Sequence, residues 1–127
     1  MSGKTNIRVH LILVTKYRKP VLTQEKMEYI IELIEQTLVD KGCVPIAIRG
    51  DQMNHVHIMT EIKPTHSVSL IVQILKQITT YHVWARHPEM RKDYWYKNVL
   101  WSSGYFCSYT GDASSETVKA YIKNQGN

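Results

Sequence analysis

Hydrophobic positions along the chain follow two periods, and together they predict seven elements. Runs rich in branched residues with partial alternation predict strands, and apolar residues spaced by three and four predict helices. Pro45 favours an edge position for the second strand, and the tripeptide at 49–51 is expected to turn the chain into a hairpin with the third. The predicted order is strand 7–15, helix 24–41, strand 43–48, strand 55–62, helix 68–86, strand 105–109 and helix 113–125.

This order is that of a split βαβ or ferredoxin-like arrangement, in which helices cover one face of an antiparallel sheet. The fold class is therefore α+β, and the helix at 113–125 is additional to the basic unit. The sequence shows no internal repeat, low-complexity segment or linker, so residues 1–127 are expected to form one domain.

The third strand carries two histidines one residue apart, His55 and His57. Side chains alternate between the faces of a strand, so both imidazoles project from one face while Val56 and Ile58 point into a core on the other. Paired imidazoles can supply two metal ligands. A His-x-His pair in a strand is more often an ordinary surface or core pair, so the metal interpretation needs a third ligand and a reactive group.

The charge of the chain permits a polyanionic partner. There are 16 Lys+Arg against 11 Asp+Glu, a formal charge of +5 and a pI near 9.2. Cys43 and Cys107 are far apart and form no metal or redox motif, so we expect them to be reduced and the protein to be cytoplasmic. The first residues lack the apolar run of a secretion signal, and no stretch is long and apolar enough to span a membrane.

Two segments combine cations with aromatic rings. Lys16, Arg18 and Lys19 flank Tyr17, which suits either a solvated turn or the binding of phosphates with a ring for stacking. Residues 88–103 are expected to form a loop whose rings either cover an edge of the core or stack on unpaired bases. The remaining histidines have no ligand-type residue at useful spacing and are expected at the surface: His10, His66, His82 and His87.

The helix at 113–125 brings Tyr121 and Gln125 onto one face, one turn apart. Taken alone, this pattern is typical of a tyrosine packed by its ring, with a glutamine at the frayed end of a helix.

Four motifs in this order resemble the single-tyrosine HUH transposases of the insertion sequence 200/605 group, which include the REP-type transposases. They are KYRKPVL at 16–22, HVH at 55–57, LWSSGYF at 100–106 and YIKNQ at 121–125. The resemblance extends from about residue 7 to residue 125, and the order and spacing of four motifs are far more specific than HVH alone.

The resemblance implies that His55 and His57 bind a divalent metal, that Tyr121 is the nucleophile and that Gln125 completes the metal site. Neutral nitrogen and oxygen ligands suit Mg²⁺ or Mn²⁺ better than a closed zinc site. Members of the group often carry Asp directly before the first histidine, where this chain has Asn54. An amide can still form hydrogen bonds, but it lacks the charge that would offset a cation.

The resemblance also implies a single-stranded DNA substrate whose ends fold into hairpins. Exchange of two DNA ends needs two covalent links at once, so a single nucleophilic tyrosine per chain requires a homodimer. That its sites are shared between subunits is implied by the resemblance alone. Alternatives are a domesticated HUH nickase acting on repetitive hairpins, a replication initiator, a non-catalytic ferredoxin-like nucleic-acid-binding module, and a small structural metal-binding protein.

Overall fold

The computed structural model describes residues 6–94 and 99–109 of the chain. Within these ranges, two α-helices and four strands form the framework, together with two short 3₁₀ helices. In chain order the elements are β1 (Ile7–Val14), η1 (Lys16–Arg18), α1 (Gln24–Asp40), β2 (Val44–Asp51), β3 (His55–Ile62), α2 (Val68–Arg86), η2 (Pro88–Asp93) and β4 (Phe106–Tyr109).

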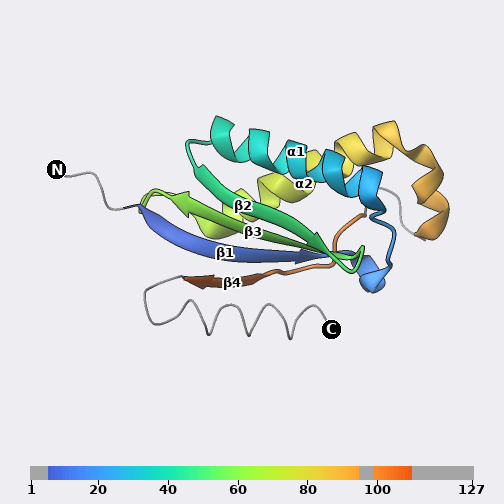
Figure 1. The fold of residues 1–127 in the computed structure, drawn as a ribbon, viewed down its shortest axis with the longest axis horizontal. Helices are drawn as coiled ribbons and strands as arrows, with labels where there is room; N and C mark the ends of the chain where they lie inside the picture. Colours follow the sequence, from blue (N-terminus) through green and yellow to red (C-terminus); the bar gives the residue numbers. More distant parts are fainter. Residues whose placement is uncertain (1–5, 95–98, 110–127) are drawn as a thin grey trace.

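The strands pair in the order β2-β3-β1-β4, and every pairing is antiparallel. Helices α1 and α2 lie together on one face of this sheet (Figure 1). The predicted α+β class and ferredoxin-like arrangement are confirmed. The predicted helix at 113–125 lies outside the described residues. None of the described helices combines the length and the apolar character that a membrane crossing requires.

The hairpin between β2 and β3 differs from the sequence prediction. Strand β2 continues through Asp51, with Gly50 opposite Val56 and Asp51 opposite His55, so the predicted turn at 49–51 is wrong. The turn lies at Gln52 and Met53, whose φ angles of 55° and 61° give the left-handed pair that suits a tight hairpin. The glycine serves packing instead, because a Cβ at position 50 would overlap the side chain of Met27 on α1.

The core lies between the sheet and the two helices. From the sheet it takes alternate residues of the two central strands, and Val56 and Ile58 are fully buried there, as predicted. Burying such a side chain contributes about 1.5–3 kcal/mol. The other buried apolar residues of this face and its helices include Val9, Leu11, Leu13, Ile30, Ile34, Leu38, Val72, Leu75 and Val83.

The segment after α2 also closes the core. Tyr94, Leu100 and Trp101 are each at most 6% exposed, and the Trp101 Nε1 donates to Thr79 Oγ1 on α2 at 2.8 Å. These residues cover an edge of the core, which was one of the two roles left open by the sequence. Residues 95–98 lie outside the described part of the chain.

Candidate functional site

The histidine pair lies on the sheet face opposite the helices. His57 is paired with Ile12 and His55 with Val14 on β1. Because the alternating residues Val56 and Ile58 belong to the core under the helices, both imidazoles point away from α1 and α2, as predicted. Their rings are nearly parallel, with centroids 6.3 Å apart and planes 12° from each other. Both are nonetheless buried, His55 at 1% and His57 at 7% exposure, so this face does not leave them open to solvent.

The orientation of His55 is set by the residue before it. Asn54 Oδ1 lies 2.5 Å from His55 Nδ1, and an amide oxygen can only accept, so Nδ1 carries the proton. In neutral imidazole the lone pair then belongs to Nε2. A hydrogen bond of this kind on one ring nitrogen is how proteins commonly orient a histidine toward a metal.

His57 has a different environment. Within the described residues neither of its ring nitrogens has a hydrogen-bond partner, since the Asp51 Oδ2 is 3.6 Å from Nε2 and too distant for a direct bond. Burial lowers the pKa of His57 below its ordinary value, and the Asp51 carboxylate offsets this in part. The ring is therefore neutral at pH 7, which is the form that binds metals.

Asp51 also belongs to this face, opposite His55, and was not among the residues predicted for the site. Its position follows from the hairpin register, which a turn placed at 52–53 would have revealed. Its carboxylate lies beside His57 and supplies a negative charge near the histidine pair, whereas the neutral amide of Asn54 supplies none.

These donors fit a divalent cation in part. Two neutral imidazoles, one oriented by an amide and one with buried unpaired nitrogens, are suitable ligands. Across the described ranges, however, no three His, Cys, Asp or Glu side chains converge closely enough to hold a metal ion. A third protein ligand, which the metal interpretation needs, would therefore be of another residue type or lie outside these ranges. Gln125 and Tyr121 lie outside the described residues, so their roles stay predictions.

His10 belongs to the same face, which corrects its predicted surface position. It lies on β1 two residues before Ile12, and its ring centroid is 6.0 Å from that of His57 in an edge-on arrangement. It is only 7% exposed, and neither ring nitrogen has a hydrogen-bond partner among the residues described. Burial, followed by the neighbouring His57, lowers the pKa of His10 to about 4.

The other histidines lie away from this face. His87 is also buried, against Tyr29 and 3.4 Å from Glu89, so its predicted surface position is wrong too. His82 is exposed as predicted, and His66 is half-buried.

The cationic turn predicted to contact phosphates lies beside the histidines. Asn54 Nδ2 donates to the carbonyl oxygen of Arg18 at 3.0 Å, and Thr15 N donates to that of Asn54 at 3.0 Å. Tyr17 and Arg18 have φ angles of 60° and 54°, a left-handed conformation that costs about 1–3 kcal/mol per residue and is common at functional sites. Asn54 thus connects the turn to His55 through the two ends of one amide.

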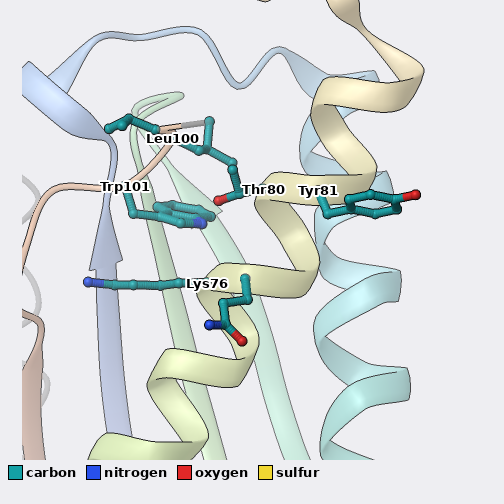
Figure 2. Close-up of a pocket in the computed structure, with 7 residues that line it drawn as sticks. Lys76, Thr80, Tyr81, Leu100 and Trp101 are labelled. Atoms are coloured by element: carbon teal, nitrogen blue, oxygen red, sulfur yellow. The ribbon is translucent and has the colours of Figure 1, made fainter. Parts of the chain in front are cut away.

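A cavity lies away from the histidine pair. Its volume is about 600 Å³, and its lining includes Lys76, Tyr81 and Trp101. In Figure 2, Lys76 and Trp101 lie on one side of α2, whereas the ring of Tyr81 projects to the other side. No histidine lines it, so it is separate from the paired imidazoles.

A ferredoxin-like sheet with paired histidines on its helix-free face is consistent with a nucleic-acid-processing enzyme, and comparison with known proteins identifies the family. The profile of the family described as "Transposase IS200 like" matches residues 3–125. The chain belongs to this family of transposases.

Individual relatives agree with this assignment. The chain is 23% identical over 119 residues to the ISDra2 transposase TnpA of Deinococcus radiodurans, covering 94% of this chain and 84% of that protein. It is 25% identical over 121 residues to the transposase of insertion sequence element IS200 from Salmonella typhimurium, covering 94% and 77%.

Solved structures share the fold. A crystal structure of a transposase from Deinococcus radiodurans R1 matches with a TM-score of 0.81 at 23% identity, over 98% of this chain and 97% of that one. A REP-associated tyrosine transposase bound to a REP hairpin matches with a TM-score of 0.61 at 11% identity, over 96% and 66%.

Proposed function

We propose that the protein cleaves and rejoins single-stranded DNA at hairpin-bearing element ends, through a 5′-phosphotyrosine link on Tyr121 and with a divalent metal. The observation that carries this proposal is the pair of buried, same-face imidazoles in a chain of the IS200-like transposase family. The amide of Asn54 orients one of them, and the other has no competing hydrogen bond within the described residues.

The reaction exchanges one phosphodiester for another. The Tyr121 oxygen bonds to phosphorus as the bond from phosphorus to the 3′ oxygen breaks, and the leaving oxygen takes up a proton to become a 3′-OH. Attack of a 3′-OH on the tyrosyl phosphodiester reverses these steps, so no external energy source is needed. Tyrosine has a pKa near 10 and is a weak nucleophile at neutral pH.

His55, His57 and Gln125 are the residues that would hold the metal. When bound, Mg²⁺ or Mn²⁺ would stabilise the charge that develops on the phosphate oxygens. His55 contributes through a ring that Asn54 fixes in one orientation, and His57 through a ring that burial keeps neutral. Asp51 adds a negative charge beside His57.

Three features support a hairpin DNA substrate, and the chemistry of strand exchange supports a dimer. The chain carries a net charge of +5, and its cationic turn lies beside the histidine pair. A structural neighbour with the same fold is described as bound to a REP hairpin. Because strand exchange requires two covalent links and each chain offers one tyrosine nucleophile, we expect a homodimer, with active sites shared between subunits.

A second candidate is a domesticated nickase that acts on repetitive hairpins, which the likeness to the REP-associated tyrosine transposase favours. It would cleave such hairpins without excising an element. A non-catalytic nucleic-acid-binding module is less well supported, because stacking modules present aromatic rings on the central strands. On the helix-free face here, central strands β1 and β3 present His10, His55 and His57.

The test is a covalent adduct assay with hairpin DNA taken from the flanks of the gene. We expect an adduct with Mg²⁺ or Mn²⁺ that disappears with chelator and in Tyr121→Phe. Tyr81→Phe is the matched control, because Tyr81 is 71% exposed on α2, which covers the sheet face opposite the histidine pair (Figure 1). An adduct that persists in Tyr121→Phe would show that another residue is the nucleophile.

A further inference from the structure

A second concave surface lies next to the histidine face. This groove of about 440 Å³ separates the η1 turn from the segment at 102–106 that leads into β4. Tyr17 and Arg18 line one wall, and Ser103 and Tyr105 line the other. Its size falls within the range of small-ligand sites.

The groove lies close to the proposed metal site in the strand register. Val14 lies at its base and is the residue of β1 that pairs with His55. Arg18, on its wall, accepts a hydrogen bond from Asn54, whose other amide atom orients His55. A ligand in the groove would therefore lie at the same end of the sheet as the first histidine.

Both walls are held in place by hydrogen bonds within the described residues. Ser102 N donates to the carbonyl oxygen of Val14 at 2.8 Å, and Lys16 N donates to that of Leu100 at 2.9 Å. Lys76 reaches across from α2 and donates to the carbonyl oxygens of Ser102 and Gly104 at 2.8 and 2.6 Å. The groove is thus preformed, and a ligand would not have to order it.

The lining indicates what kind of ligand it suits. Tyr17 is 56% exposed and Tyr105 is 37% exposed, so each ring has an accessible surface next to the guanidinium of Arg18. Lys16 Nζ lies 5.2 Å from the centroid of the Tyr17 ring and adds a second cation. Rings combined with cations fit a base and its phosphate, because the base stacks while the phosphate is held by charge.

We propose that this groove holds one nucleotide of the single strand that adjoins the cleaved phosphodiester, with its base against Tyr17 and Tyr105 and its phosphate near Arg18. The proposal rests on the proposed function for its substrate, single-stranded DNA. It adds the segment at 102–106 as one wall of the DNA site and gives Tyr17 and Tyr105 a stacking role.

The test compares two DNA hairpins that differ only in their single-stranded extensions. One carries short extensions with normal bases, and the other carries abasic extensions with the same phosphates. Binding is measured by fluorescence anisotropy in chelator, so that no cleavage occurs. We expect the wild type to bind the base-bearing hairpin more tightly, by about 5- to 100-fold.

The variants separate stacking from other effects. Replacing both rings, Tyr17→Leu with Tyr105→Leu, should abolish the preference for bases, whereas Tyr17→Phe with Tyr105→Phe should retain it. Tyr81→Leu removes an exposed ring from α2 and should leave the preference unchanged. Thermal unfolding of each variant confirms that it is folded.

Two results would overturn the proposal: a wild type that binds both hairpins equally, or a leucine pair that keeps the full preference. The outcome is independent of the covalent chemistry. Loss of the preference in the leucine pair, together with no adduct in the Tyr121 assay, would uphold the groove and reject the proposed function. If the leucine pair keeps the preference and the Tyr121-dependent adduct forms, the groove proposal is rejected and the proposed function is upheld.

Discussion

The two faces of the central strands differ in what they bury. Toward the helices, β3 presents Val56 and Ile58 to a dry apolar core. On the opposite face the same strand presents His55 and His57, and β1 adds His10. Both faces are buried to a similar degree. Among the described residues that β1 and β3 themselves contribute, buried ring nitrogens without hydrogen-bond partners lie on the second face, on His10 and His57; on the helix side such polar atoms come from Trp84 and Tyr94, outside the strands.

The two faces of β3 therefore differ in their contribution to stability. A buried polar group without a hydrogen bond costs about 1–3 kcal/mol, so an apolar side chain would serve the fold better at these positions. The helix-facing residues stabilise the sheet, and the histidines are tolerated at a cost. Such a cost is typical of a site that awaits a ligand.

The largest effect on stability should come from the apolar face. Ile58→Ala removes a fully buried side chain and leaves a cavity between sheet and helices, which costs about 2–5 kcal/mol. Urea unfolding followed by circular dichroism measures the change. A loss below about 1 kcal/mol would mean that this face is not the main source of stability.

On the histidine face, an apolar substitution should not reduce the free energy of unfolding. His57→Leu replaces two unpaired ring nitrogens with an apolar side chain, so unfolding free energy should stay equal or rise slightly. The variant should lose its stabilisation by Mn²⁺, which in the wild type is about 2.7 kcal/mol at 100 times the Kd. Thermal unfolding with and without Mn²⁺ tests this, with exposed His82→Leu as control. Undiminished stabilisation in His57→Leu would exclude His57 as a ligand.

The two faces were not equally predictable from the sequence. Alternation in β3 was enough to assign Val56, Ile58 and the histidine pair to their faces, because the period of a strand is a local property. Asp51 and His10 join the pair only through strand pairing. The face on which Asp51 lies depends on the position of the hairpin turn. The glycine at position 50 suggested a turn there, whereas it is needed for the close approach of Met27 on α1. His10 and His57 are separated in sequence by the whole of η1, α1 and β2, so no spacing rule could connect them.

Asn54 offers a more specific test of the histidine face. Asn54→Asp keeps an acceptor for His55 Nδ1 but replaces the donor to Arg18 with a second oxygen, so the turn should loosen at a cost of about 1 kcal/mol. The added charge should strengthen Mn²⁺ binding. Asn54→Ala loses both hydrogen bonds, and we expect Mn²⁺ binding to weaken by about 10-fold. Calorimetric titration with Mn²⁺ distinguishes the two variants. An Asn54→Ala variant that binds Mn²⁺ as tightly as the wild type would show that Asn54 does not orient His55.

A last test of the histidine face concerns His10. Its pKa of about 4 in the folded state lies below the ordinary 6.5, so between these values the unfolded chain binds more protons. The associated stability is complete above pH 6.5 and decreases as the pH falls toward 4. His10→Leu should flatten this slope and add about 1 kcal/mol at pH 7, because it removes a buried ring without partners among the described residues. Urea unfolding at a series of pH values measures both effects, again with His82→Leu as control. An unchanged slope would mean that His10 accepts protons as readily in the folded chain as in the unfolded one, and that burial on this face does not keep its imidazole neutral.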